Sequence, residues 1–196
     1  MFTGIVRDVG NIVRTQRGEL MVASALAASA QLGDSIAVNG VDLTVTTRDE
    51  RTFTANVMPE TVRRSTLGQL AEGAAVNLEP AIRPIDGLSG HIVRGVVEGR
   101  ATLIARDHDE DAIILRFTCD TADLVRHMVV KGPVALDGVS LTLIEVDTPR
   151  FAVSVVQYTA AHTTLGSIGI GDQVNVETDL LSRYVEAALS ARGDDP

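Results

Sequence analysis

The sequence predicts an all-β fold, with two similar small barrels in tandem and one C-terminal α-helix. Three observations support this prediction. The second half of the chain repeats the first, each repeat consists mainly of short alternating strands, and only the last segment has helical spacing. The repeat is plainest where NGVDLTVT at 39–46 returns as DGVSLTLI at 137–144. A chain of 196 residues has room for two such domains, since domains commonly hold about 100–150 residues.

The repeat extends well beyond this pair. Ser140 stands 98 positions after Asp42, and the same offset relates TVRRSTLG at 61–68 to TAAHTTLG at 159–166. Upstream the offset is 91, where FTGIV near the start matches VRGVV at 93–97, so the second copy holds about seven extra residues, which we place in RDHDEDA at 106–112. A single long period indicates two domains rather than a solenoid of short units. The Pro- and Gly-containing stretch at 80–90 marks the junction, which predicts domains at 1–86 and 87–178, with the tail at 179–196.

Within each copy the local pattern is that of strands. SIAVNGVDLTVT at 35–46 and TFTANVMP at 52–59 alternate in the first copy, as do VALDGVSLTLI at 134–144 and RFAVSVVQYT at 150–159 in the second. β-branched residues fill these runs, and turn residues separate them. Asn39-Gly40 and Asp137-Gly138 predict tight hairpin turns. About six short strands in roughly 90 residues predict a small closed barrel.

The last segment, DLLSRYVEAAL at 179–189, has a different period. Its apolar residues recur at helical spacing and form one stripe: Leu180, Leu181, Tyr184, Val185, Ala188 and Leu189. Asp179 can cap the start of this helix. Such a helix packs either on its own barrel or on a neighbouring subunit, and the sequence leaves both open.

Composition excludes several classes of function. A net charge of −9 and a pI near 4.8 argue against a nucleic-acid partner, because phosphates favour a basic surface. No apolar run reaches the length of a membrane span, and the N-terminus lacks the features of a signal peptide. One cysteine, Cys119, excludes an intramolecular disulfide and a multi-thiolate metal site. We therefore expect a cytoplasmic protein that contacts neither nucleic acid nor membrane.

Taken together, MFTGIV, the NGVDLTV and DGVSLTL pair, the two TLG elements, SGHIVRG and DLLSRYVEAAL resemble the riboflavin synthase family, which includes non-catalytic lumazine proteins. The resemblance runs through the whole chain in order. It implies two six-stranded Greek-key barrels, each binding one lumazine or flavin, and a C-terminal helix that assembles a homotrimer. The family enzyme moves a four-carbon unit between two molecules of 6,7-dimethyl-8-ribityllumazine and yields riboflavin and a diaminopyrimidine. It requires no metal or added cofactor, and lumazine, riboflavin or FMN are the ligands implied.

The resemblance also implies the ligand-binding positions. For the first barrel these are Gly4, Ile5, Val6, Asp42, Leu43, Thr44, Asn56, Val57, Met58, Pro59, Glu60 and Thr61, with Gly95, Val96 and Val97 in addition. For the second barrel they are Lys131, Ser140, Leu141, Thr142, Val156, Gln157, Tyr158, Thr159, Ala160 and Ala161. Backbone groups in such stretches suit the pyrimidine edge of the ligand, and short hydroxyls suit its ribityl chain. In family members each active site joins the first barrel of one subunit to the second barrel of its neighbour.

Catalytic roles are implied at a smaller set. The acidic residues Asp137 and Asp179 and the hydroxyl of Ser140 fall near the reacting pair, and Lys131 is the sole basic group near ligand. Lys131 is also the only lysine in the chain, although a chance survivor of an Arg-rich composition would look the same. Much of the catalysis would come from positioning two identical substrates, which can contribute about 7–11 kcal/mol. Proton transfer supplies the rest.

Departures from the family pattern gather in the first barrel. Asp42 stands where the enzyme usually has cysteine, and Val96 stands where it usually has a second histidine. In the second barrel, Val156 to Thr159 replace a Pro-containing stretch, while the polar residues of that barrel keep the family pattern. A carboxylate at position 42 could act as a base toward the methyl proton of the acceptor, or could repel the carbanion that forms. Val96 can neither donate nor accept a proton.

Simpler interpretations apply to several of these residues. Thr44, Thr61, Thr142 and Thr159 could be ordinary strand residues. His91 has no second ligand at metal spacing, so we expect a structural hydrogen bond and no metal. His108, within an acidic run, and His162 are expected in solvent, and Cys119 is expected in a core.

Three functions are compatible with these residues. The first is a working riboflavin synthase with an unusual first-barrel site. The second is a lumazine or flavin carrier without turnover. The third is a paralogue that acts on a modified lumazine or flavin, with Asp42 as a specificity contact.

Overall fold

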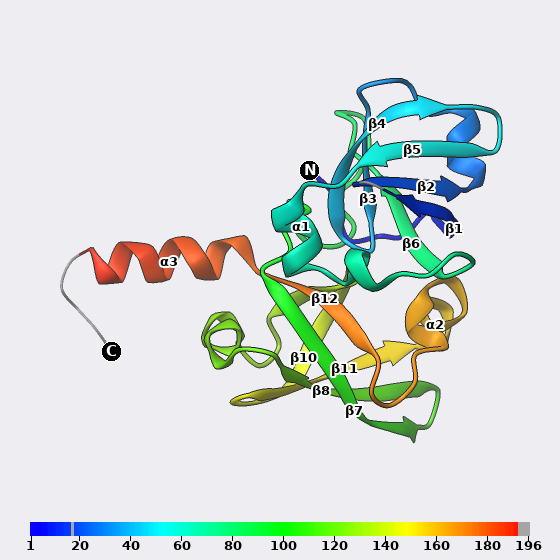
Figure 1. The fold of residues 1–196 in the computed structure, drawn as a ribbon. Helices are drawn as coiled ribbons and strands as arrows, with labels where there is room; N and C mark the ends of the chain where they lie inside the picture. Colours follow the sequence, from blue (N-terminus) through cyan, green and yellow to red (C-terminus); the bar gives the residue numbers. More distant parts are fainter. Residues whose placement is uncertain (17, 192–196) are drawn as a thin grey trace.

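The computed structural model describes residues 1–16 and 18–191 and contains two closed antiparallel barrels, one above the other in Figure 1. The first barrel consists of β1 (Asp8–Gln16), β2 (Glu19–Ala23), β3 (Ser35–Val38), β4 (Val41–Arg48), β5 (Thr52–Asn56) and β6 (Ala75–Pro80). The second consists of β7 (Gly99–Asp109), β8 (Ala112–Cys119), β9 (Pro133–Leu136), β10 (Val139–Asp147), β11 (Arg150–Val156) and β12 (Gln173–Thr178). The six-strand prediction for each repeat is confirmed.

Both barrels have the same strand order. In the first, the order is β1-β2-β5-β4-β3-β6, so the chain passes from β2 to β3 across the positions of β5 and β4, which is a Greek-key connection. The second barrel repeats this order with β7 to β12. The predicted hairpin turns are present, with Asn39 and Asp137 at positive φ of 45° and 44°, each followed by a glycine at 76°. Two successive positive φ values match the right-handed twist of the strands that such turns join.

Alternating side chains fill each barrel with its own apolar core. The first core includes Phe53 and Leu78, and the second includes Phe117 and Phe151, whose rings stack at 5.4 Å between centroids. Cys119 is buried in the second core, as expected. The β7–β8 hairpin is longer than the β1–β2 hairpin and ends at the predicted insertion, where His108 is exposed.

Four 3₁₀ helices and two short α-helices connect the strands: η1 (Ala25–Ala28), η2 (Thr66–Gln69), η3 (Ala122–His127), η4 (Thr164–Gly166), α1 (Pro59–Arg64) and α2 (Gln157–His162). The prediction that strands continue through Pro59 and through Thr159 is wrong, because the chain turns into α1 and α2 there. Pro59 occupies the first turn of α1, where its missing N–H costs nothing. Thr61 and Thr159 therefore lie on helices rather than strands.

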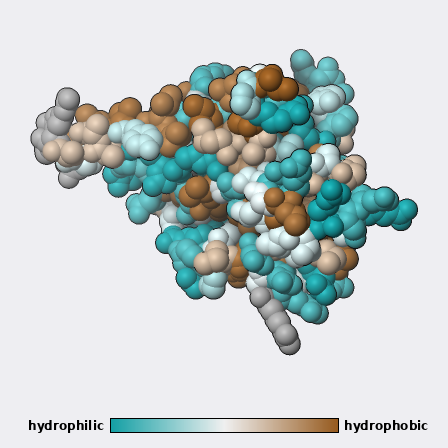
Figure 2. All heavy atoms as spheres, turned by 90° about the horizontal axis from the view of Figure 1, so that it is seen from above, coloured by the Kyte–Doolittle hydropathy of each residue, from teal (hydrophilic) through white to brown (hydrophobic). Residues whose placement is uncertain are grey.

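The C-terminal helix α3 (Leu180–Ser190) starts where expected and stands away from both barrels (Figure 1). The Asp179 side chain caps it by accepting a hydrogen bond from the Leu181 backbone N–H. None of its residues is buried, and Leu181, Tyr184, Val185 and Leu189 are all exposed. Figure 2 shows hydrophobic side chains gathered along this projecting helix. It does not pack on its own barrel, and none of the helices in the described residues is long and apolar enough to cross a membrane.

The barrels are joined by two short segments that cross between them, which we name the first strap (residues 2–6) and the second strap (residues 93–97). The straps pair antiparallel through Phe2 and Val93, with backbone N–O distances of 2.7 and 3.1 Å. These two side chains form a small core with Ala37 and Ala135. Each of the four residues has its counterpart in the other repeat, so the junction has approximate two-fold symmetry.

Candidate functional site

The second barrel brings Ser140, His91 and Gly4 together. Ser140 lies on β10, which pairs with β9 over Val139–Thr142 and with β11 only from Leu143 onward. The first strap approaches this unpaired side, where the Ser140 N–H donates to the Gly4 carbonyl at 2.8 Å. His91, just before the second strap, places Nδ1 2.7 Å from the Ser140 hydroxyl oxygen.

The surroundings of His91 favour the neutral form of its imidazole. Burial lowers the pKa of His91 below its ordinary value, although the nearby charge of Asp179 opposes this shift. In the neutral tautomer that carries its proton on Nε2, Nδ1 accepts the hydrogen bond of the Ser140 hydroxyl and makes the oxygen more nucleophilic; in the other tautomer Nδ1 donates. The other ring nitrogen, Nε2, is buried and has no hydrogen-bond partner among the described residues. The expected structural hydrogen bond of His91 thus ends on a predicted catalytic side chain.

The equivalent place in the first barrel has the same backbone and different side chains. Asp42 lies on β4, and its N–H donates to the carbonyl of Gly95 in the second strap at 3.0 Å. The Asp42 carboxylate is exposed and forms no hydrogen bond or ion pair within the described part of the chain. Val96, also exposed, is the next strap residue. Asp42 and Val96 are therefore neighbours in space.

The straps are exchanged between the barrels. Gly4 contacts Ser140, and Val6 packs against the core of the second barrel, while Gly95 contacts Asp42 and Val97 packs against the core of the first. The assignment of Gly4, Ile5 and Val6 to the first barrel is therefore wrong. Sequence order suggested it, but the strand that follows each strap belongs to one barrel and the strap itself lies against the other.

The remaining predicted ligand residues differ in their exposure. We name the predicted ligand positions of the first barrel the first opening, and those of the second barrel the second opening. Leu43, Leu141 and Val57 are buried in the barrel cores. Val57 also lines a cavity of about 180 Å³ with Leu20, Val62 and Leu67. Three of the others are half-buried, namely Thr61, Thr159 and Ala160. The rest are exposed: Thr44, Asn56, Met58, Pro59, Glu60, Thr142, Val156, Gln157, Tyr158 and Ala161. The openings lie on the surface of a single chain.

Lys131 lies just before β9 with φ of 70°, a conformation that L side chains rarely adopt. Its counterpart in the first repeat is Gly33, with φ of 89°. The Lys131 N–H donates to the Leu143 carbonyl at 2.8 Å, and the exposed ammonium forms no ion pair among the described residues.

Asp137 lies apart from this cluster, in the β9–β10 turn at the junction between the barrels. Its carboxylate accepts from the Asn175 N–H at 2.8 Å, as the Asn39 side chain accepts from the Asn77 N–H at 2.7 Å. Complete burial raises the pKa of Asp137 to about 7. A cavity of about 330 Å³ between the barrels is lined in part by Asn39, Thr66 and Asp137. The turn geometry accounts for Asp137 as a structural residue.

Two site features could not be found from the sequence. The His91–Ser140 contact joins residues 49 positions apart, and no spacing rule connects a loop histidine to a strand of another hairpin. The helices α1 and α2 carry six residues each and no buried apolar face, so they have no helical period to detect. Pro59 followed by the Glu60–Arg64 pair was the one available signal. His162 is exposed, as expected, and stacks on Tyr158.

Known proteins are similar to this chain in both sequence and architecture. The family described as Lumazine binding domain matches residues 3–81 and 94–179, one copy per barrel. Riboflavin synthase from Actinobacillus pleuropneumoniae is 38% identical over all of this chain and 94% of its own length. The riboflavin synthase of Mycobacterium tuberculosis is 41% identical over 98% of this chain and 100% of its own.

A solved structure has the same arrangement of barrels. The crystal structure of LumP complexed with riboflavin superimposes with a TM-score of 0.80 at 25% identity, covering 91% of this chain and 99% of that one. Full-length similarity to riboflavin synthases, together with two matched lumazine-binding domains, leads to one conclusion: the chain belongs to the riboflavin synthase family.

Proposed function

We propose that this chain binds 6,7-dimethyl-8-ribityllumazine and converts two molecules of it into riboflavin and a diaminopyrimidine by four-carbon transfer. The observation that carries the proposal is the 2.7 Å contact between His91 Nδ1 and the Ser140 hydroxyl, beside a strap that belongs to the other repeat. A carrier needs a pocket and hydroxyls for its ligand, but it has no need of a nucleophile polarised by a neutral imidazole.

Ser140 is proposed as the nucleophile that attacks the donor lumazine, with His91 accepting its proton. Asp179 lies close enough to His91 to influence its charge. Asp42 is proposed as the group nearest the acceptor, whose 7-methyl carbon must lose a proton. Lys131 and the openings around α1 and α2 are proposed to bind the ligands. The reaction needs no metal or added cofactor, and it forms riboflavin from substrate atoms alone.

The active site is proposed to form between subunits. Each opening lies on the surface of the single chain, and the apolar face of α3 is uncovered. A homotrimer held together by α3 would bring the first barrel of one subunit against the second barrel of the next and place two lumazines face to face. We place such an enzyme in the cytoplasm.

A second function is favoured by the first-barrel site. Asp42 and Val96 replace a thiol and an imidazole in adjacent places, and a chain so altered could bind lumazine or flavin without turnover. LumP structures that contain riboflavin and 6,7-dimethyl-8-(1'-D-ribityl)lumazine share this fold. An acceptor site without proton transfer would make the protein a carrier.

One assay separates the two functions. The purified protein is incubated with 6,7-dimethyl-8-ribityllumazine, and riboflavin is followed by its absorbance. If the protein is the enzyme, riboflavin should form at a rate proportional to the protein concentration. The variant Ser140→Ala should lower kcat by about 100-fold or more. Stoichiometric binding with no riboflavin formed would contradict the enzyme and support the carrier. An equal rate for Ser140→Ala would remove Ser140 from the mechanism.

A further inference from the structure

Two buried glutamates occupy equivalent places in the repeats, Glu79 on β6 and Glu177 on β12, and neither belongs to the site described above. They are 5% and 3% exposed. Carboxylates are rarely buried so fully unless hydrogen bonds or charges compensate for the loss of water. Here the compensation comes from the straps.

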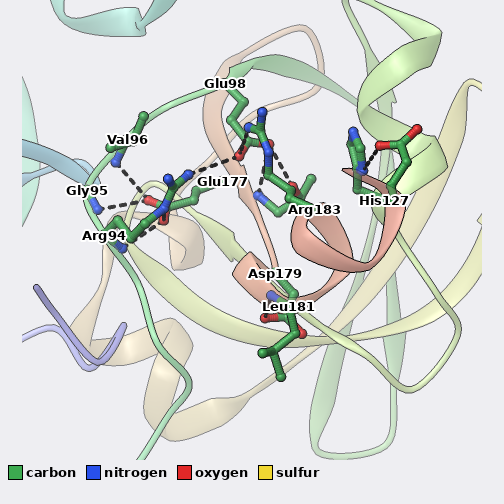
Figure 3. Close-up of polar contacts among 11 residues, drawn as sticks. Arg94, Gly95, Val96, Glu98, His127, Glu177, Asp179, Leu181 and Arg183 are labelled. Carbon is green, nitrogen blue, oxygen red and sulfur yellow. Dashed lines mark hydrogen bonds and ion pairs between the residues drawn. The ribbon is translucent and has the colours of Figure 1, made fainter. Parts of the chain in front are cut away.

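Each carboxylate binds consecutive backbone N–H groups of one strap. Glu79 accepts from the N–H groups of Thr3 at 2.7 Å and Gly4 at 2.9 Å, and from the Thr3 hydroxyl at 2.7 Å. Glu177 accepts from three N–H groups, those of Arg94 at 2.7 Å, Gly95 at 2.9 Å and Val96 at 3.0 Å (Figure 3). Both oxygens of each glutamate are used, which holds the strap in one orientation as well as one place.

The opposite side of each strap faces the other barrel. Gly4, held by Glu79 of the first barrel, contacts Ser140 of the second. Gly95, held by Glu177 of the second barrel, contacts Asp42 of the first. The connection is therefore crossed: the carboxylate of one barrel sets the backbone that completes the opening of the other.

Each strap approaches the opposite barrel closely at a glycine. Gly4 and Gly95 have φ of 76° and 81°, which glycine adopts without strain. A Cβ at Gly4 would lie 2.6 Å from the Ser140 Cβ, and one at Gly95 would lie 2.6 Å from the Asp42 Cβ. A strap so tightly enclosed takes its position from the carboxylate behind it.

We propose that Glu79 and Glu177 are positioning residues for ligand binding, each fixing the strap that completes the site of the opposite barrel. This inference rests on the proposed function only in taking both openings as ligand sites. The second strap has an additional link that the first lacks. Arg94 lies 3.7 Å from Glu177 and 3.5 Å from Glu98, and Glu98 also pairs with Arg183 of α3 (Figure 3).

The test compares Glu79→Gln and Glu177→Gln. Glutamine has the same shape, but it replaces one acceptor oxygen by a donor that faces a backbone N–H. Hydrogen exchange measured by mass spectrometry should quicken at residues 2–6 in Glu79→Gln and at residues 93–97 in Glu177→Gln, and in neither case at the other strap. Unchanged exchange of β5 and β11 shows that the barrels remain folded. Glu145→Gln, which changes an exposed carboxylate on β10, is the control.

Ligand binding gives the crossed readout, with riboflavin as the probe. In the unaltered chain riboflavin should slow exchange at residues 56–61 and at 157–161. Glu79→Gln should weaken binding about 10- to 100-fold at 157–161 only, and Glu177→Gln at 56–61 only, because a small misplacement of a binding element has effects of that size. The conservative variants Glu79→Asp and Glu177→Asp, which keep both acceptor oxygens, should restore part of the loss.

The outcomes are distinct. Loss at the opposite barrel with a loosened strap supports the proposal. An undisturbed strap, or loss at the same barrel as the glutamate, overturns it, and so does equal loss at both sites. Absence of turnover in the unaltered chain contradicts the proposed enzyme but leaves these binding and exchange results decisive. If riboflavin slows exchange at neither opening of the unaltered chain, the proposal is overturned together with ligand binding itself.

Discussion

Asp137 and Asn39 occupy the same turn position in the two repeats, so the chain contains its own comparison of an acid with an amide. Both side chains accept a hydrogen bond from the backbone of an asparagine, Asn175 or Asn77. Only the acid can take up a proton. The pKa of Asp137 in the folded chain, about 7, lies above its ordinary value of 3.8, because burial disfavours the ionised form.

Asp137 should therefore make stability depend on pH. The folded state holds this proton more tightly than the unfolded state, so the stabilisation is complete below about pH 4 and is lost as the pH rises toward 7. Asp137→Asn keeps the acceptor and removes the titration. Urea unfolding at pH 5 and pH 8 should show that the variant is the more stable of the two at pH 8, by up to about 4 kcal/mol. An identical pH dependence in both proteins would show that Asp137 does not titrate in this range.

The first-barrel site gives a second prediction at this scale. The backbone hydrogen bond between Asp42 and Gly95 brings Asp42 next to Val96. A thiol and an imidazole placed at these two positions would therefore be within reach of one ligand. Asp42→Cys with Val96→His should raise kcat for riboflavin formation by about tenfold or more if proton transfer at this site limits turnover. The single variants serve as controls. An unchanged or lower rate would mean that the surrounding pocket has adapted to Asp42.

Residue roles were only partly predictable from the sequence. The alternation of apolar and polar residues around Asp42 and Ser140 is a local pattern. The strands, the turns and the correspondence between the two repeats can therefore be predicted from neighbouring residues. The contacts that define their chemistry are not local. Gly4, Glu79 and His91 reach Ser140 or its strap across the barrel junction, and no periodicity encodes which barrel a five-residue segment will lie against.

At the scale of elements, the hairpin turns limit how closely the barrels can approach. A Cβ at Gly40 would lie 2.7 Å from the Gly138 backbone nitrogen, so the two turns meet back to back with only glycine between them. Asn77 and Asn175 secure the same junction by donating to the carbonyls of Asp137 and Asn39 at 3.0 and 2.8 Å. The turn sequences thus serve the hairpins and the junction together.

Gly40→Ala should destabilise the chain through both strain and contact. Gly33→Ala is the matched control, because Gly33 also has positive φ but nothing lies within 4 Å of an added Cβ. The control should cost about 1 kcal/mol, and Gly40→Ala should cost about 3 kcal/mol or more. Chemical denaturation measures both. Equal losses would show that the junction yields to an added methyl group.

The elements that sequence predicted best were those with a repeating apolar pattern. The barrel strands and α3 have such a pattern. The predicted positions of the hairpin turns and of the start of α3 agree with the structure. α1 and α2 have none, because they lie on the rims of the barrels with no buried side chain. What α3 packs against was left open by its sequence, and the structure excludes its own barrel.

At the scale of the whole molecule, α3 presents an uncovered apolar face. Its stripe includes Leu181 at 67% and Val185 at 59% exposure, far from either core. Ion pairs link it to the second repeat, Glu98 with Arg183 and Glu186 with Arg126. A helix with an exposed apolar face is suited to assembly.

Leu181→Glu with Val185→Glu should therefore convert the proposed trimer to monomers, because burying two charges in an apolar contact is unfavourable. Folding should be unaffected, since neither side chain is buried in the single chain. Light scattering after size exclusion gives the mass, with Ala187→Glu, which lies off the stripe, as the control. If the double variant keeps the mass of the unaltered protein, α3 does not hold the assembly together.

The crossed straps have a consequence for how such a protein could arise. A chain with a single repeat would fold a barrel but leave its opening unfinished, since the segment that finishes it lies on the other copy. Two such chains would have to trade N-terminal segments, as domain-swapped dimers do. Joining the copies in one polypeptide makes that contact intramolecular. Its effective concentration is then independent of the protein concentration. Once joined, the two openings are free to diverge, and Ser140 and Asp42 differ while the frame around them remains the same.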